Sequence, residues 1–306
     1  ATAYGATLPA SSDATGLWWA SSGWKISRER KVPEATSSAI RLALARNERE
    51  AAQLVVRPEE PLTGLQLTPE ALTNAQGDVL AAEHLELLKV GYVRISQPTD
   101  DLGSRGEWPD PLPPIDGPLD LAPGANQPFW VCVHAPKGTP AGVYTGAIRL
   151  DADGWEATVP LEVEVFDFEL PDQATCQTAF GFNGTYAKQY HGVSAEADVQ
   201  KLADLYLEEL AKRRISPYEL HDEIIYPELS YTWPDAPEPG ERVPEADLER
   251  VFQPEFDWET WDAEMTRLIE TYHINSFVLK TPGLGAGAGW SGEAASTSLQ
   301  MPLASL

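Results

Sequence analysis

The sequence is poor in basic charge and has no long apolar run. Its 306 residues contain 22 lysines and arginines against 47 aspartates and glutamates, a formal net charge of −25. A surface with this charge repels phosphate backbones and anionic lipid headgroups, so we expect neither nucleic acid nor membrane as a partner. No apolar stretch approaches the roughly 18 residues of a membrane-spanning helix. These absences leave a globular protein, and the length suggests two domains.

Cysteine is also scarce. Cys132 and Cys176 are the only two, they form no C-x-x-C motif, and no histidine stands at zinc spacing from them. The sequence therefore indicates neither a metal site nor a disulfide framework, and we expect two buried thiols and no cofactor.

The polar start of the chain, ATAYGATLPASSDATG, leaves the location of the protein open. Such a start is compatible with a mature N-terminus after signal cleavage and equally with an arbitrary boundary. The sequence is thus compatible with a cytoplasmic or a secreted protein.

Hydrophobic residues alternate with polar ones over residues 16–170, which is typical of half-buried strands. In the clearest case Leu161, Val163 and Val165 face one way, and Asp151–Gly154 supplies a hairpin turn before them. The pattern predicts an antiparallel β-sandwich domain over residues 1–170. The strand candidates are GLWWASSGWKIS, AIRLALA, EAAQLVVRP, LELLKVGYVRIS, PFWVCVHAP and AGVYTGAIRLDADGWEATVPLEVEVFDFELP.

Residues 97–127 interrupt this rhythm with seven prolines, six acids and one tryptophan. A connection of this length without secondary structure is usually functional or wraps another element. We favour a proline-stiffened strap across a domain junction, because proline stiffens a loop without needing a ligand. The alternative is a loop that reaches a ligand cleft with Trp108 as a sugar platform.

After residue 170 the pattern changes to β-α-β-α-β, the start of a parallel sheet or barrel. We expect strands over residues 176–183, 215–220 and 274–285. The first helix is capped by Ser194 and runs to Arg214, and the second begins at Asp257. Two apolar helix faces are predicted to pack on the sheet. They consist of Val199, Leu202, Tyr206 and Leu210 and of Trp258, Trp261, Met265, Leu268, Ile269 and Tyr272.

The predicted sandwich contains the stretches LARNEREAAQLVVRP, QPFWVCVHAPKGTPAGVYTGAIRL and VPLEVEVFDFELP, and the residues after it contain RRISPY, FDWETWDAEM and INSFVLKTPGLGAG. The first three stretches resemble the N-terminal sandwich of glycoside hydrolase family 123, the β-N-acetylgalactosaminidase family. The last three resemble the opening of its barrel. The resemblance implies a (β/α)₈ TIM-like barrel after the sandwich and a glycan substrate. It also implies a substrate-assisted retaining mechanism, in which the 2-acetamido oxygen of the sugar attacks the anomeric carbon with the help of an adjacent Asp-Glu pair.

Asp222 and Glu223, in the stretch PYELHDEIIYP, are candidates for that pair. The family's pair follows the fourth strand and ends in Asp-Glu-Pro, whereas this one follows the second strand and precedes Ile-Ile-Tyr-Pro. The two carboxylates are thus a catalytic pair, a contribution to the cleft or solvated loop residues. We expect the catalytic pair to lie beyond Leu306. Residues near the carboxyl ends of the strands are candidates for substrate binding: Phe180, Asn183, Tyr218, His221 and Asp222.

A (β/α)₈ barrel takes roughly 250 residues, so residues 171–306 are too few to close one. We therefore expect an incomplete barrel domain over these residues, with the remainder supplied by the same polypeptide or by a partner chain. The alternative function is a non-catalytic carbohydrate-binding or cell-surface protein whose sandwich holds its ligand on Trp18, Trp19 and Trp24.

Overall fold

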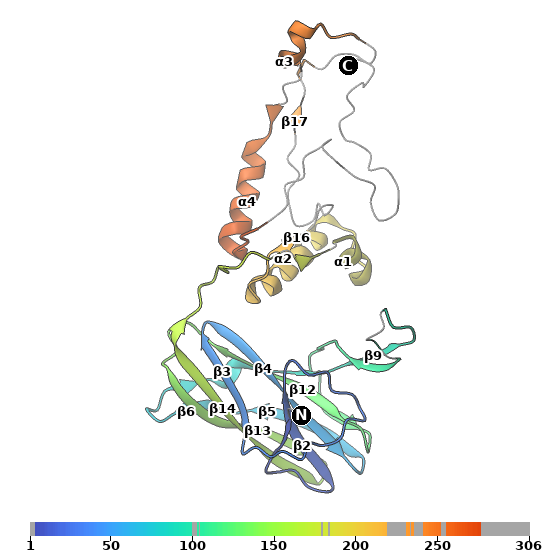
Figure 1. The fold of residues 1–306 in the computed structure, drawn as a ribbon, viewed down its shortest axis with the longest axis vertical. Coiled ribbons are helices and arrows are strands. Elements are labelled where there is room, and N and C mark those ends of the chain that lie inside the picture. Colours follow the sequence, from blue (N-terminus) through green and yellow to red (C-terminus); the bar gives the residue numbers. More distant parts are fainter. Residues whose placement is uncertain are drawn as a thin grey trace. The chain divides into compact units, whose positions relative to one another are not determined.

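The computed structural model describes most of the chain up to residue 276. The described residues are 4–99, 103, 105–178, 180–182, 184–218, 231–232, 234–235, 241–251 and 255–276. Contacts divide the chain into two compact units, Ala1–Leu170 and Pro171–Leu306. Each is described by itself below (Figure 1).

The first unit consists of two sheets that face each other. One has five strands in the order β1-β2-β4-β12-β8, and the other has seven, with the path β11-β5-β13-β14-β3 and with β6 and β7 attached. The strands of the first sheet are β1 (Ala6–Thr7), β2 (Thr15–Ser21), β4 (Glu48–Pro58), β8 (Leu85–Lys89) and β12 (Gln127–Ala135). Those of the second are β3 (Ile40–Arg46), β5 (Leu62–Pro69), β6 (Leu72–Asn74), β7 (Val79–Leu80), β11 (Leu119–Leu121), β13 (Gly142–Ala152) and β14 (Trp155–Glu169). A short 3₁₀ helix, Ala82–His84, precedes β8, and β9 (Tyr92–Ile95) pairs with β10 (Gly106–Pro109) as a separate arm.

A single apolar core fills the space between the two sheets. Leu54 and Phe129 enter it from the five-stranded sheet, while Leu161, Val163 and Val165 enter it from β14. The predicted alternation in β14 is confirmed, since these three side chains are at most 2% exposed and the glutamates between them point outward. Burial of such side chains stabilises the fold by roughly 1.5–3 kcal/mol each.

The predicted antiparallel pairing is confirmed for most of the strands, with one exception. β3 pairs in parallel with β14, for example Leu42 with Val163. A parallel pair needs a long connection, and here more than a hundred residues separate the two strands. The hairpin turn is also shorter than predicted: Ala152 pairs with Trp155, so the turn is Asp153–Gly154, and Gly154 has the positive φ of 73° that glycine tolerates.

The outer face of the five-stranded sheet is also covered. Trp18 and Val55 form a second small cluster with Ile26, which lies in the loop after β2. Because β2 and β4 are buried on both faces, Trp18 is 0% exposed and Trp19 packs on the main core. The prediction that these two tryptophans form a sugar platform is therefore wrong.

The described part of the segment over residues 97–127 is a strap over edges of the first unit and contains the strands β10 and β11, whereas the domain junction that we expected it to cross stays a prediction. The middle of the strap runs along β8, the edge of the five-stranded sheet, where Lys89 N donates to Pro113 O at 3.1 Å and Gly91 N donates to Pro111 O at 2.7 Å. Its end forms β11, which pairs with β5 at the edge of the other sheet. The strap thus covers an edge of each sheet within one unit, which protects both edges from pairing with other chains.

The second unit contains three helices longer than one turn among its described residues. Its elements are β15 (Phe180–Gly181), α1 (Gly184–His191), α2 (Glu196–Lys212), β16 (Pro217–Tyr218), β17 (Tyr231–Thr232), η2 (Glu245–Asp247), α3 (Leu248–Val251), β18 (Glu255–Phe256) and α4 (Trp258–Tyr272). β15 pairs in parallel with β16, and β17 pairs antiparallel with β18. Among the described residues of the strand expected over 176–183, only those of β15 form a strand, and α1 was not predicted.

The start of α4 was predicted correctly and the start of α2 was not. Asp257 is the N-cap of α4, where its Oδ1 accepts from Thr260 N at 3.2 Å. The N-cap of α2 is Ala195 and not Ser194, and no side chain caps this end. Two acids in the first turn, Glu196 and Asp198, stabilise this end of α2 instead, because they lie at the positive end of the helix dipole.

The two long helices share one apolar cluster, in which Leu207 of α2 meets Met265, Leu268 and Tyr272 of α4. Ala203 and Leu207 are the buried positions of α2, whereas the predicted face residues beside them are half-buried. The prediction for α4 is wrong at two positions, because Trp258 and Ile269 are 51% and 42% exposed.

The expectation of two buried thiols holds for one cysteine only. Cys132 is buried in β12, whereas Cys176 is exposed before β15.

The hydroxyl of Tyr144 ties β13 to the turn before it, and its removal should weaken the sandwich. The ring is fully buried, and Oη donates to Pro140 O at 2.8 Å. We expect Tyr144→Phe to lower the free energy of unfolding of this unit by about 1–2 kcal/mol, because the carbonyl loses its partner. Urea unfolding followed by circular dichroism measures the change. Tyr190→Phe, at a ring that is 84% exposed, is the control and should have no effect.

Alkaline pH should destabilise the same unit. Burial raises the pKa of Tyr144, as it does that of Tyr92, whose hydroxyl donates to Ile26 O at 2.8 Å. Above a pH of about 10 these tyrosines ionise in the unfolded chain but not in the folded one. The folded state then holds more protons, so stability falls as the pH rises, by up to about 1.4 kcal/mol per pH unit for each tyrosine. Unfolding measured between pH 8 and 11 should show this slope, and an equally steep slope in Tyr92→Phe/Tyr144→Phe would contradict the assignment.

Candidate functional site

The parallel pair β15 and β16 forms the candidate site of the second unit. Phe180 lies opposite Pro217 and Gly181 lies opposite Tyr218, and the helices α1 and α2 connect the two strands. Parallel strands linked by helices present their carboxyl ends at one edge, which is where α/β proteins bind ligands. The carboxyl ends of β15 and β16, at Gly181 and Tyr218, therefore mark that edge.

Of the predicted substrate-binding residues, two lie on these strands. Phe180 is the first residue of β15 and is 53% exposed, and Tyr218 is the last residue of β16. Asn183, His221 and Asp222, together with the catalytic candidate Glu223, lie outside the described residues. The structure thus brings Phe180 and Tyr218 to adjacent strands and leaves the other assignments as predictions.

The helix α1 adds two exposed tyrosines that the sequence analysis missed. Tyr186 and Tyr190 are 59% and 84% exposed, and their ring centroids are 6.4 Å apart. The signal was present, since an i, i+4 pair lies on one face of a helix and Gly192, with φ 65°, ends it. Exposed tyrosine rings combine an apolar face with a polar tip, a combination suited to sugar rings.

Behind the tyrosines, aromatic contacts connect α1 to α2. The ring of Phe182 packs against that of Tyr206 at 4.9 Å between centroids, and the Tyr206 hydroxyl lies 3.1 Å from His191 Nε2. Phe182 also packs against the apolar cluster of α2 and α4. These contacts position α1 directly after β15.

The amino ends of the strands are joined by a polar cluster. Ser216 Oγ donates to Asn275 Oδ1 at 2.9 Å, and Asn275 Nδ2 donates to Ala174 O at 2.7 Å and to Cys176 O at 3.2 Å. Thr178 Oγ1 accepts from Ser216 N at 2.7 Å. The cluster therefore fixes the chain before β15, the start of β16 and the segment after α4 to one another. In barrel-like folds this end serves stability and the opposite end serves function.

An ion-pair network supports the packing of α2 against α4. The guanidinium of Arg267 lies 2.6 Å from a Glu264 carboxylate oxygen and 3.1 Å from Asp204 Oδ1, so it joins the two helices. Hydrogen bonds to Glu264 are the largest cause of its raised pKa. The arrangement is structural, since both carboxylates are already engaged.

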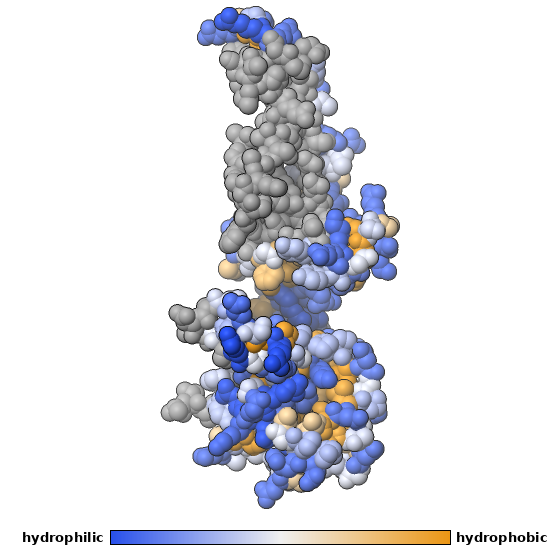
Figure 2. All heavy atoms as spheres, turned by 90° about the vertical axis from the view of Figure 1, so that its right-hand side faces the viewer, coloured by the Kyte–Doolittle hydropathy of each residue, from blue (hydrophilic) through white to orange (hydrophobic). Residues whose placement is uncertain are grey.

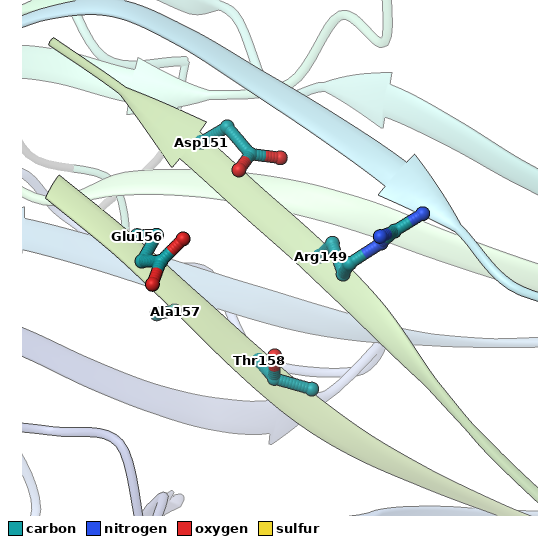
Figure 3. A pocket seen from close by; sticks show the side chains of 5 residues that line it. All are labelled: Arg149, Asp151, Glu156, Ala157 and Thr158. Atoms are coloured by element: carbon teal, nitrogen blue, oxygen red, sulfur yellow. The ribbon is translucent and has the colours of Figure 1, made fainter.

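A separate depression of about 310 Å³ lies on the outer face of the seven-stranded sheet. Figure 3 shows Arg149 and Asp151 on β13 beside Glu156 and Thr158 on β14. Arg149 is paired with Glu70 at 3.0 Å. These side chains are exposed, and nothing excludes water from them, so the depression lacks the enclosure of a catalytic site.

Neither a metal site nor a membrane span is found in the part of the chain that the structure describes. Over these residues no group of three or more His, Cys, Asp or Glu side chains is arranged to hold a metal ion. Within the same residues no helix is long and apolar enough to cross a membrane. On the face seen in Figure 2, the described surface is largely hydrophilic, with apolar patches between.

The described residues define a two-unit protein, a mostly antiparallel sandwich followed by an α/β unit with exposed aromatic residues on β15 and α1. Residues 19–152, less than half of the chain, match the family model described as "Glycoside hydrolase 123 N-terminal domain". The chain therefore resembles glycoside hydrolase family 123, as expected from the quoted stretches.

A solved structure of a family 123 glycoside hydrolase from Clostridium perfringens shares this fold. That structure was solved to show the details of glycolipid glycan hydrolysis, and it matches with a TM-score of 0.60 at 14% sequence identity. The match covers 86% of this chain and 46% of that chain, so this chain spans about half the length of its structural relative.

Two further solved structures match about half of this chain only. The CooA pilin subunit from enterotoxigenic Escherichia coli covers 51% of it at 15% identity and a TM-score of 0.25. The Salmonella SafD adhesin covers 52% at 13% identity and a TM-score of 0.24. CooA is covered over 99% of its length and SafD over 100%, but at these scores neither match carries an argument. No curated protein sequence matches the chain.

Loss of the polar cluster should destabilise the second unit and leave the first unit unchanged. Asn275→Ala removes the three side-chain hydrogen bonds that join the strand starts, and we expect a loss of about 2–4 kcal/mol in the second unit. Hydrogen exchange should then become faster in β15, α2 and α4 and stay unchanged in the sandwich. Asn275→Asp keeps the acceptor for Ser216 but loses both donors, so it should have a similar effect. Unchanged exchange in β15 with either variant would contradict the role of the cluster.

Proposed function

We propose that the protein is a glycoside hydrolase of the family 123 type that releases a terminal β-linked N-acetylhexosamine from a glycan. The observation that carries the proposal is the match of residues 19–152 to the N-terminal domain of that family. The shared fold with the Clostridium perfringens enzyme supports it, because that match extends over 86% of the chain and includes more than the sandwich.

Two domains are part of the proposal, a sandwich over residues 1–170 and the first part of a (β/α)₈ barrel over residues 171–306. The division of contacts after Leu170 supports the boundary. The parallel pairing of β15 with β16 through two helices supports the barrel, since such a crossover is its repeating unit. The rest of the barrel comes from the same polypeptide or from a partner chain.

The reaction that fits this family type is substrate-assisted and retains the anomeric configuration. The 2-acetamido oxygen of the sugar attacks the anomeric carbon, the bond to the leaving oxygen breaks, and a general acid donates a proton to that oxygen. The same group then removes a proton from the water that opens the oxazoline. One carboxylate of an Asp-Glu pair orients the acetamido group and the other transfers the proton. Asp222 and Glu223 remain candidates for this pair, with a pair beyond Leu306 preferred.

The described residues contribute to binding rather than to bond cleavage in this proposal. Tyr186 and Tyr190 supply exposed rings close to the carboxyl end of β15, and Phe180 and Tyr218 lie on the paired strands. A sugar ring stacked on such an aromatic face gains affinity and orientation. The alternative, a carbohydrate-binding protein without catalysis, has lost two residues of its platform, because Trp18 is buried and the half-buried Trp19 packs against the core.

An assay with two aryl glycosides tests the proposed function. The product of the full open reading frame should hydrolyse p-nitrophenyl β-N-acetylgalactosaminide at least about 100-fold faster than p-nitrophenyl β-galactoside, because the galactoside lacks the internal nucleophile. Proton NMR should show retention of configuration. The chain of residues 1–306 alone should be inactive. If residues 1–306 alone show turnover and Asp222→Asn or Glu223→Gln abolishes it, these two residues are the catalytic pair. If both proteins bind the glycoside saturably without turnover, the result favours the alternative, a carbohydrate-binding protein without catalysis.

Two variants test the tyrosines in the same assay. Tyr186→Ala and Tyr190→Ala should each raise KM about 3- to 10-fold and leave kcat nearly unchanged, as expected for lost stacking of about 0.5–1.5 kcal/mol. Phe168→Ala, at a ring that is 55% exposed on the sandwich, is the matched control. A rise in KM for the control alone would place the glycan elsewhere.

A further inference from the structure

The loop after β2 is the most basic segment of an acidic chain. Residues 24–31, WKISRERK, contain four basic residues and one acidic residue. We refer to them as the basic loop. The whole chain carries a net charge of −25, so a local excess of positive charge on this loop stands out from its surroundings.

The backbone of the basic loop is held by hydrogen bonds from its neighbours. Gln53 Nε2 donates to Trp24 O at 2.7 Å, and Asn126 Nδ2 donates to Ser27 O at 2.9 Å and to Arg30 O at 2.7 Å. Further donors reach the carbonyls of Ile26, Arg28 and Lys31. These hydrogen bonds fix the course of the loop beside β4.

Two arginines of the loop are stacked on aromatic rings. The guanidinium of Arg28 lies 4.0 Å from the centroid of Tyr92, and that of Arg30 lies 4.7 Å from Tyr4 and 5.8 Å from Trp24. Stacking engages the face of a guanidinium and leaves its N–H edge available for an oxyanion in the same plane. The side chains are therefore fixed in orientation before any ligand arrives.

Neither arginine has an acidic partner within the described residues. No hydrogen bond or ion pair joins the side chain of Arg28 or Arg30 to another described residue, and Arg30 Nε is buried without a hydrogen-bond partner. By contrast, Lys25 pairs with Asp110 at 3.0 Å. Both guanidinium groups are therefore free of acidic partners within the described residues, and their charge is available to an anion.

We propose that the basic loop binds a sugar that carries one oxyanion substituent, a carboxylate or a sulfate. The N–H edges of Arg28 and Arg30 would hold the oxyanion, and Trp24, which is 40% exposed beside Arg30, would hold the apolar face of the sugar. A long polyanion fits less well, because the excess negative charge of the chain repels it beyond the loop. This site lies in the sandwich unit and does not depend on the proposed hydrolysis.

Calorimetric titration of the chain of residues 1–306 tests the proposal. Methyl β-glucuronide should bind at least about 10-fold more tightly than methyl β-glucoside, and N-acetylglucosamine 6-sulfate should exceed N-acetylglucosamine by a similar factor, as expected for one charge-assisted pair. The two arms distinguish a carboxylate from a sulfate as the preferred substituent. Equal affinity for charged and neutral sugars in both arms would overturn the proposal.

Matched variants separate the loop from general charge effects. Arg28→Gln/Arg30→Gln should reduce the affinity for the charged sugar to that for the neutral one, whereas Arg41→Gln/Arg149→Gln removes the same charge from the other sheet and should change little. Trp24→Ala keeps all the charges, so it should weaken sugar binding about 5-fold or more and leave the binding of inorganic sulfate unchanged. Three outcomes would each overturn the assignment. They are an unchanged affinity for the charged sugar in Arg28→Gln/Arg30→Gln, binding of inorganic sulfate as tight as that of the sulfated sugar, and binding of a DNA duplex that is tighter than that of the charged sugar.

Discussion

The burial of β4 on both of its faces is the constraint on which the sandwich depends. Leu54 and Val56 enter the core between the sheets, while Val55 packs outward against Trp18 and Ile26. A strand that is buried on both faces is largely apolar, as residues 51–56 are except at Gln53, and it needs a second layer outside the sheet. The basic loop provides that layer, and Gln53, a buried polar residue of β4, holds its backbone. The loop that carries the candidate anion site is therefore the same loop that covers the outer face of β4.

The sequence predicted correctly those features that depend on residues close to one another in the chain. The alternation in β14 and the aspartate cap of α4 depend on neighbours within a few residues, and both were predicted correctly. Ser194 looked like a cap for the same reason, but the helix starts one residue later than a Ser194 cap requires, after Ala195. The resemblance to family 123 came from longer stretches of sequence and agrees with the independent family match.

Features that depend on distant residues could not be predicted. Trp18 and Trp19 read as surface aromatics because nothing nearby in the sequence shows that a loop will cover one and a second sheet the other. The aromatic stripe of α4 has helical spacing throughout, yet its apolar contacts with α2 involve only part of it. Among the site residues, Phe180 and Tyr218 lie on two strands that pair in parallel, which spacing alone does not reveal.

The parallel pairing of β3 with β14 has a consequence for synthesis on the ribosome. β3 ends at Arg46 and its partner begins at Trp155, so the edge of the seven-stranded sheet stays open until the intervening chain has been made. At about 5–20 residues per second this delay is roughly 10 s. During that time the apolar side chains of β3 have no partner strand and are exposed to aggregation. Once Glu169 emerges, the sandwich can close before most of the second unit exists.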